Sequence, residues 1–170
     1  EMCIRNSFLQ NAKGVVDVSQ WQGTINWSKA KAAGVQGAII RLSFGWGNGY
    51  DDHALANIKA CLKLGIPFGL YMYSYAYDST TAAAEGADVV SLLCKAGITA
   101  SQLSYPIFYD LEDWTWRGHS HPTTASASVP IVNASYSKLP SAGYDTLGVY
   151  QFTRYLDGPL NAPSIWSTVK

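Results

Sequence analysis

Tyr105-Pro-Ile-Phe-Tyr-Asp-Leu-Glu-Asp-Trp114 is a run of mostly strand-forming residues that ends in acidic ones. The pattern is typical of a buried strand whose C-terminal end carries Asp110 and Glu112. Because side chains alternate between the two faces of a strand, these carboxyl groups point the same way and Leu111 points the other way. Two carboxyl groups in a dry place raise the pKa of one of them, as an acid catalyst requires. Taken alone, the spacing is more often chance in a chain with 12 acidic residues, so its meaning depends on the rest of the sequence.

Around this strand, one pattern of helix, glycine and hydrophobic strand recurs. Helical segments end at Ala32-Ala33-Gly34, Lys63-Leu64-Gly65, Lys95-Ala96-Gly97 and Ser141-Ala142-Gly143. Each glycine supplies the left-handed residue that closes a helix, and lysines in the last turns offset the helix dipole. The predicted strands cover residues 15–18, 37–42, 66–73, 105–109 and 147–150, with a sixth beginning at Ile165-Trp166.

These strands are apolar on both faces and are separated by amphipathic helices at 54–64 and 81–96. Such an alternation calls for a parallel sheet covered by helices. The sequence therefore predicts an α/β fold, a TIM-like (β/α) barrel or most of one.

Composition limits the function classes. With 170 residues, 48% of them hydrophobic, the chain fits one domain with a real core. Twelve basic residues balance twelve acidic ones, which disfavours nucleic acid and anionic membrane surfaces as partners. No window reaches the roughly 18 to 20 apolar residues that a membrane helix needs. Six Trp and eleven Tyr suit stacking against sugar rings.

The first 13 residues read as a tail without the basic and apolar regions of a signal peptide, so a signal peptide is expected to have been removed. Cys61 and Cys94 fall in predicted helices, where buried free thiols are expected, although a bridge between them stays open. Together with Cys3 they leave the compartment undecided.

Polar and aromatic side chains gather after the predicted strand ends, where barrel enzymes carry their functional residues. A third acid, Asp17, ends the first strand and joins Asp110 and Glu112 on the same rim. Core packing is an equally good explanation for Tyr71 and Tyr150. The candidate substrate-binding residues are Arg41, Asp51, Tyr73, Tyr75, Trp114 and Tyr150.

The motifs Asp17-Val-Ser-Gln-Trp-Gln-Gly23, Asn26-Trp27, Ile39-Ile-Arg41, Gly65-Ile-Pro-Phe-Gly-Leu-Tyr71 and Tyr109-Asp-Leu-Glu112 resemble the glycoside hydrolase family 25 lysozymes, the Chalaropsis-type muramidases. The resemblance runs from about Gly14 to the C-terminus. It implies an incomplete eight-stranded barrel that hydrolyses the β-1,4 bond after N-acetylmuramic acid in peptidoglycan.

The resemblance also implies roles for single residues. Glu112 matches the general acid, Asp110 its partner carboxylate, and Asp17 the acid on the first strand. Asp51 and Asn57 match the pattern after the second strand, although Ala54 stands where an aromatic residue is usual.

For the whole protein, we expect a secreted, monomeric enzyme that acts on peptidoglycan or a related glycan without a cofactor. Family members continue past the strand that begins at Ile165, so we expect residues 14–170 to form an irregular catalytic barrel that lacks its C-terminal strands.

Several alternatives are weaker. A non-catalytic cell-wall-binding module would keep the tryptophans but has no need of clustered acids, and a metal-dependent deacetylase needs His and Asp ligands at strand ends. Phe44-Gly-Trp-Gly-Asn-Gly49 lacks the spacing and the lysine of a phosphate loop and reads as a rim turn. His119 and His121 with Asp113 lie in a segment that reads as a flexible loop, so no metal site is predicted.

Overall fold

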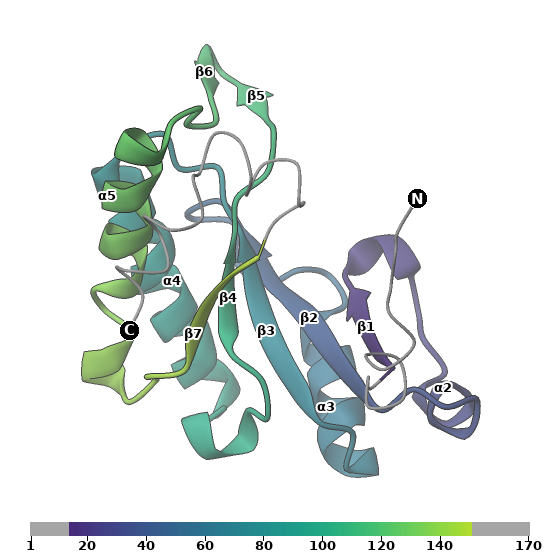
Figure 1. Ribbon diagram of the computed structural model, residues 1–170. Helices are drawn as coiled ribbons and strands as arrows, with labels where there is room; N and C mark the ends of the chain where they lie inside the picture. Colours follow the sequence, from purple (N-terminus) through teal and green to yellow (C-terminus); the bar gives the residue numbers. More distant parts are fainter. Residues whose placement is uncertain (1–13, 151–170) are drawn as a thin grey trace, which may run out of the picture.

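In the computed structural model, which describes residues 14–150, five parallel strands form one sheet (Figure 1). The spatial order of these strands is β1-β2-β3-β4-β7, which is also their order along the chain. Because every crossover advances in the same direction, right-handed connections place the covering helices on one face and leave the other face for a site. The strands are β1 (Val15–Val18), β2 (Gly37–Phe44), β3 (Phe68–Tyr73), β4 (Ile107–Asp110) and β7 (Leu147–Tyr150).

Four α-helices and three short 3-10 helices connect these strands within the described residues. Buried apolar side chains from the strands and helices form the main core. From the sheet, every second residue contributes to it, for example Ile40, Leu70 and Tyr109. The helices are α2 (Trp27–Ala32), α3 (Ala54–Leu64), α4 (Ser79–Ala96) and α5 (Ala125–Tyr136), with η1 (Gln20–Gln22), η2 (Ala100–Gln102) and η3 (Pro140–Ala142).

The helix ends follow the expected local chemistry. Gly65, Gly97 and Gly143 adopt the left-handed conformation after α3, α4 and η3, as predicted. At the other end of α4, the Asp78 side chain accepts a hydrogen bond from the Thr81 backbone, 2.8 Å away. Helix α5 packs closely on α4 at Gly86, which has no side chain. A Cβ atom at this position would clash with the backbone oxygen of Ser135.

The α/β class and the parallel sheet are confirmed, but the sheet does not close into a barrel within residues 14–150. The predicted strand at Ile165 and the N-terminal tail at 1–13 lie outside the described residues. Two predicted strands began too early: β3 starts directly after Pro67 and β4 directly after Pro106. Proline has no N–H to donate to a neighbouring strand, so the regular ladder starts after it.

Residues 117–124 were predicted to be a flexible loop, and this was wrong for residues 117–120, which belong to a hairpin. Strand β5 (Thr115–Trp116) pairs antiparallel with β6 (His119–Ser120) through a two-residue turn. Both turn residues have positive φ, 49° at Arg117 and 81° at Gly118, as type I′ hairpin turns require. Arginine is an uncommon residue in this conformation, which is why the sequence did not indicate the hairpin.

The cysteine predictions are partly confirmed. Among the described cysteines, Cys61 on α3 is buried and Cys94 on α4 is exposed, and both are free thiols. The expectation of a buried Cys94 was wrong, because this residue lies on the outer side of its helix. No helix in the described part of the chain combines the length and the apolar character needed to cross a membrane.

Candidate active site

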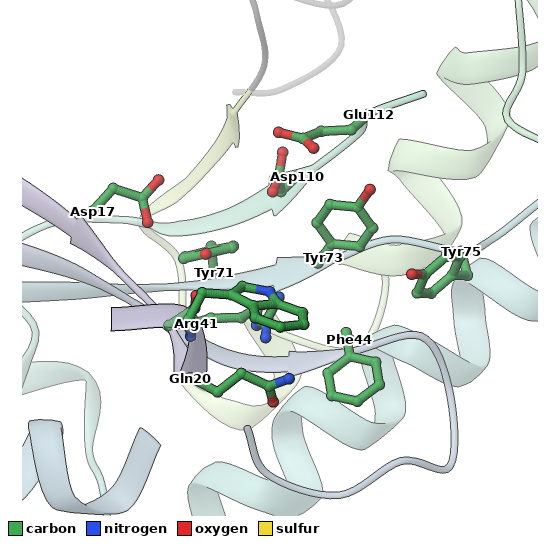
Figure 2. Close-up of a pocket in the computed structure, with 11 residues that line it drawn as sticks. Asp17, Gln20, Arg41, Phe44, Tyr71, Tyr73, Tyr75, Asp110 and Glu112 are labelled. Carbon is green, nitrogen blue, oxygen red and sulfur yellow. The ribbon is translucent and has the colours of Figure 1, made fainter. Parts of the chain in front are cut away.

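A cavity of about 400 Å³ opens at the C-terminal edge of the sheet (Figure 2). Strand register explains its composition, because Arg41 lies opposite Tyr71 and Tyr73 lies opposite Asp110 on neighbouring strands. A bulge between Arg41 and Ser43 shifts the register of β2, so that Phe44 lies opposite Tyr73. The lining residues are Asp17, Ser19, Gln20, Trp21, Arg41, Phe44, Tyr71, Tyr73, Tyr75, Asp110 and Glu112.

The three predicted acids come together here. Asp17 is on β1, Asp110 is the last residue of β4, and Glu112 follows two positions later on the same side of the cavity (Figure 2). Asp110 is only 2% exposed, whereas Glu112 is half-buried. The prediction from alternating side chains is confirmed, since Leu111 is 3% exposed and belongs to the core on the other side.

Burial is the main reason that the acids titrate abnormally. It raises the pKa of Asp110 to about 8, helped by the negative charges of Glu112 and Asp17 and opposed by Arg41. The pKa of Glu112 is also raised by burial, and a hydrogen bond from the Tyr73 side chain lowers it in part. The pair of carboxyl groups therefore retains a proton near neutral pH.

Tyrosines hold the outer acids in place. The side chains of Tyr71 and Tyr150 hydrogen-bond Asp17, and the side chain of Tyr73 hydrogen-bonds Glu112. Burial raises the pKa of all three phenols, that of Tyr150 to about 12. They are thus neutral hydrogen-bond donors at any physiological pH.

The Asp110 carboxyl group has one oxygen atom that can accept a further hydrogen bond. Among the described residues, its Oδ1 atom is buried without a hydrogen-bond partner. Buried polar atoms are nearly always paired in folded proteins. An unpaired carboxyl oxygen in the wall of a cavity is therefore suited to receive an N–H or O–H group from a bound molecule.

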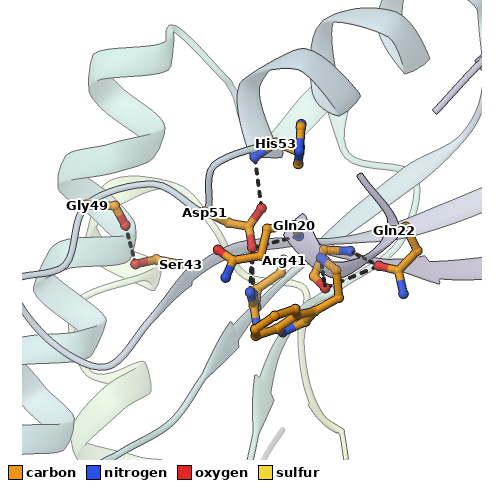
Figure 3. Close-up of polar contacts among 9 residues, drawn as sticks. Gln20, Gln22, Arg41, Ser43, Gly49, Asp51 and His53 are labelled. Carbon is orange, nitrogen blue, oxygen red and sulfur yellow. Dashed lines mark hydrogen bonds and ion pairs between the residues drawn. The ribbon is translucent and has the colours of Figure 1, made fainter. Parts of the chain in front are cut away.

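Arg41 lines the cavity, whereas Asp51, with which it is paired in Figure 3, is not among the lining residues. Asp51 is 2% exposed, and its Oδ2 atom lies 2.7 Å from both Nε and Nη2 of Arg41. The same carboxylate accepts hydrogen bonds from the backbone N–H groups of Gln20 and His53, each at 3.0 Å. Asp51 thus fixes Arg41 and the turn after β1, and the expectation that it contacts substrate does not match this placement.

Two other predicted residues differ from expectation. Trp114 is only 8% exposed and is absent from the described lining; it packs edge-on against Tyr75 with ring centroids 5.5 Å apart. The polar sequence around it suggested exposure, but its indole packs inward against Tyr75. Tyr150 reaches the site through its hydrogen bond to Asp17, with its ring 6.3 Å from that of Tyr71.

The turn after β1 was not among the predicted site residues, yet it contributes Ser19, Gln20 and Trp21 to the cavity. Ser19 and Gln22 form a capping box around this turn, with the Ser19 N–H donating to Gln22 Oε1 at 2.6 Å. The Ser-x-x-Gln spacing of these two residues could have indicated this turn from the sequence. Trp21 is 77% exposed, so its indole is free to meet a ligand at the cavity mouth.

Within residues 14–150, no group of three or more His, Cys, Asp or Glu side chains could hold a metal ion. His119 stacks on Tyr77 with centroids 3.7 Å apart, and His121 lies 3.2 Å from Asp113. The histidines therefore support the hairpin.

Solved structures share this fold. The modular autolysin LytC from Streptococcus pneumoniae superposes with a TM-score of 0.84 and 33% sequence identity, over 95% of this chain and 37% of LytC. LytC has also been solved in complex with a synthetic peptidoglycan ligand. The muramidase from Trichobolus zukalii shares the fold at a TM-score of 0.70 and 17% identity, over 88% of this chain and 70% of that one.

Among curated proteins, Lysozyme M1 from Streptomyces globisporus is 42% identical over 59 residues, which are 35% of this chain and 20% of the lysozyme. This chain thus spans about a fifth of that relative and 37% of LytC. The family model described as Glycosyl hydrolases family 25 matches residues 16–162, most of the chain. Together with the rim of acids at the strand ends, this match shows that the chain belongs to glycosyl hydrolase family 25.

Proposed function

We propose that this protein is a lysozyme that hydrolyses the β-1,4 bond between N-acetylmuramic acid and N-acetylglucosamine in peptidoglycan. The observation that carries the proposal is the convergence of Asp17, Asp110 and Glu112 on one cavity. Family membership and the complex of LytC with a peptidoglycan ligand support the choice of substrate. Since this substrate lies outside the cytoplasmic membrane, we also infer a secreted enzyme, and we expect a monomer.

We further infer that the open sheet is part of an incomplete (β/α) barrel. Its strand order follows the chain without reversal, as in a barrel and unlike a doubly wound sheet. The cavity lies at the C-terminal ends of the strands, which is the face that barrel enzymes use.

Glu112 is the proton donor in this proposal. It is the more accessible of the two neighbouring acids, and its raised pKa favours the protonated form that a general acid needs. Asp110 lies too deep to reach a glycosidic oxygen first, because it is only 2% exposed.

Asp110 binds the 2-acetamido group of the sugar. Its unpaired Oδ1 atom is available to accept the amide N–H. Accepting this hydrogen bond favours the charged form of Asp110 and lowers its pKa. The proton that the pair retains is then held by Glu112, where the reaction requires it.

The reaction proceeds with the acetamido oxygen as the nucleophile. This oxygen bonds to the anomeric carbon while the glycosidic C–O bond breaks and Glu112 gives its proton to the leaving oxygen. Water then opens the cyclic oxazolinium intermediate and returns a proton to Glu112, so that the configuration is retained. Asp17, held by Tyr71 and Tyr150, stabilises the developing positive charge.

The arrangement of acids favours this route over attack by an opposing carboxylate. Asp110 and Glu112 leave the same strand end two positions apart, a backbone spacing of about 7 Å, and so lie on one side of the cavity. The alternative is a water activated by Asp17 across the cleft, which gives inversion.

Incubation with purified peptidoglycan tests the proposed function. We expect soluble fragments with new reducing ends at N-acetylmuramic acid, read by mass spectrometry, and far fewer of them with Glu112→Gln. A chain that binds peptidoglycan but releases no fragments would instead be a carbohydrate-binding module.

A further inference from the structure

A second, smaller cavity adjoins the catalytic one. It encloses about 210 Å³ and shares Phe44 and Tyr75 with the catalytic cavity, so the two meet at these rings. Sites for drug-sized ligands measure roughly 300 to 1,000 Å³, so this volume suits a single ring. We call it the aromatic pocket; its lining residues are Phe44, Trp46, Asn48, Tyr75 and Trp116.

The loop after β2 provides one wall and is held in a defined conformation. Gly45, Gly47 and Gly49 all have positive φ, which lets the backbone turn repeatedly and present Trp46 and Asn48 between them. The Gly47 N–H donates to Asp88 Oδ2 on α4 at 2.6 Å, and Asn48 Nδ2 donates to the Phe44 carbonyl at 2.7 Å. The glycine-rich motif therefore builds a pocket wall.

The β5–β6 hairpin provides the adjoining wall. Trp116 on β5 meets Trp46 edge-on with ring centroids 5.9 Å apart. The Arg117 guanidinium lies 4.5 Å from the Trp116 ring, and Tyr77 stacks on His119 of β6. These contacts hold the indole of Trp116 before any ligand arrives, which reduces the entropy lost on binding.

The chemistry of the wall selects a neutral ring. Trp116 is 41% exposed and Trp46 is half-buried, so part of each indole remains accessible to a ligand. None of the described lining residues is charged, and Asn48 adds an amide beside four aromatic rings. Aromatic faces with a few polar groups match a pyranose, which has apolar C–H faces and hydroxyl edges.

We propose that the aromatic pocket is a distal sugar subsite. It holds a neutral pyranose of the same glycan chain whose scissile bond lies at the carboxylates, and the shared rings of Phe44 and Tyr75 connect the two positions. The proposal rests on the proposed function for the identity of the chain. Its consequence is a preference for long glycans over short ones.

Binding tests the subsite without requiring catalysis. The probe is a β-1,4-linked N-acetylglucosamine tetramer, compared with the dimer, titrated by calorimetry into the wild type and Trp116→Ala. We expect the tetramer to bind the variant up to roughly tenfold more weakly, the size of one lost aromatic contact, and dimer binding to be unchanged. Trp116→Phe should bind nearly as the wild type does.

Leu62→Ala is the matched control, because Leu62 is an exposed apolar residue on α3 and 40% accessible. Equal tetramer affinity for the wild type and Trp116→Ala would overturn the subsite, as would equal losses for tetramer and dimer. If Trp116→Ala unfolds, Trp46→Ala is titrated in its place against the same criteria. Absence of peptidoglycan cleavage by the wild type would overturn the proposed function alone.

Discussion

Arg41, in the wall of the candidate active-site cavity, forms a buried ion pair with Asp51, with Nη2 and Oδ2 2.7 Å apart. Their side chains are 9% and 0% exposed, so water cannot replace either partner. The pair fixes a cationic side chain of the cavity wall against a residue of the loop that follows β2. The pair serves mainly to position the two side chains, because the cost of desolvating both charges offsets much of their attraction.

Asp51→Ala should destabilise the protein by roughly 3 to 5 kcal/mol, because it leaves the Arg41 charge buried and unpaired. Urea unfolding measures this loss. Asp52→Ala is the matched control, since the neighbouring carboxylate is exposed and should change stability by less than about 0.5 kcal/mol. Equal unfolding midpoints for the two variants would contradict the positional role of Asp51.

Glu112→Gln should lower turnover on peptidoglycan by about 10² to 10⁴-fold, the usual contribution of a general acid. The fold should persist, because the side chain is half-buried and Gln has nearly the same shape. Reducing-end release and thermal unfolding are measured on the same preparation. Asp113→Asn serves as control, since it removes one charge nearby from a side chain that is 79% exposed. Near wild-type turnover in Glu112→Gln would remove Glu112 from the role of acid.

Glu85 should make stability fall as the pH rises. This carboxyl group on α4 is fully buried, and burial raises its pKa to about 7, against hydrogen bonds from Tyr109, the Tyr75 backbone and Ser74 that lower it. The folded protein thus keeps a proton that the unfolded chain releases at its ordinary pKa of 4.5. The stabilisation is complete below that value and is lost as the pH rises through about 7.

Urea unfolding at pH 5 and pH 8 checks this behaviour. Glu85→Gln should reduce the change in the free energy of unfolding between these two pH values by up to about 3 kcal/mol. A smaller pH dependence should remain, because the pKa of Asp110 is raised in the same direction. Asp52→Asn should leave the slope unchanged. An identical slope in Glu85→Gln and the wild type would show that Glu85 is ionised in the folded protein.

Trp114→Ala should cost roughly 3 to 5 kcal/mol of stability, as expected for a buried tryptophan. Trp116→Ala should cost far less, because Trp116 is 41% exposed. Thermal unfolding of the two variants makes the comparison. If instead Trp114→Ala weakened binding of peptidoglycan fragments at an unchanged melting temperature, its indole would be a sugar contact.

The first-formed product should be the β-anomer, because attack by the acetamido oxygen and then by water retains the configuration. Proton NMR during the first minutes of cleavage distinguishes the anomers before mutarotation. An initial α-anomer from the β-linked substrate would exclude the acetamido-assisted route and favour a water activated by Asp17.

Local chemistry in the sequence determined the parallel α/β layout and the placement of the proposed catalytic acids. Alternation along β4 was enough to place Asp110 and Glu112 on one side and Leu111 on the other. Glycines after α3 and α4 marked their ends, because few other residues adopt the left-handed conformation at low cost. These features depend on neighbours in the chain, so the sequence contains them directly.

Only the tertiary structure decided which side chains reach the cavity. Asp51 and Trp114 come after strand ends as Glu112 does, yet Asp51 is not among the lining residues and Trp114 packs inward. Exposure of such residues depends on elements distant in the chain, and here on a hairpin whose turn uses Arg117 with positive φ. The aromatic pocket arises in the same way, because Trp46 and Trp116 are 70 positions apart and meet only when the sheet has formed.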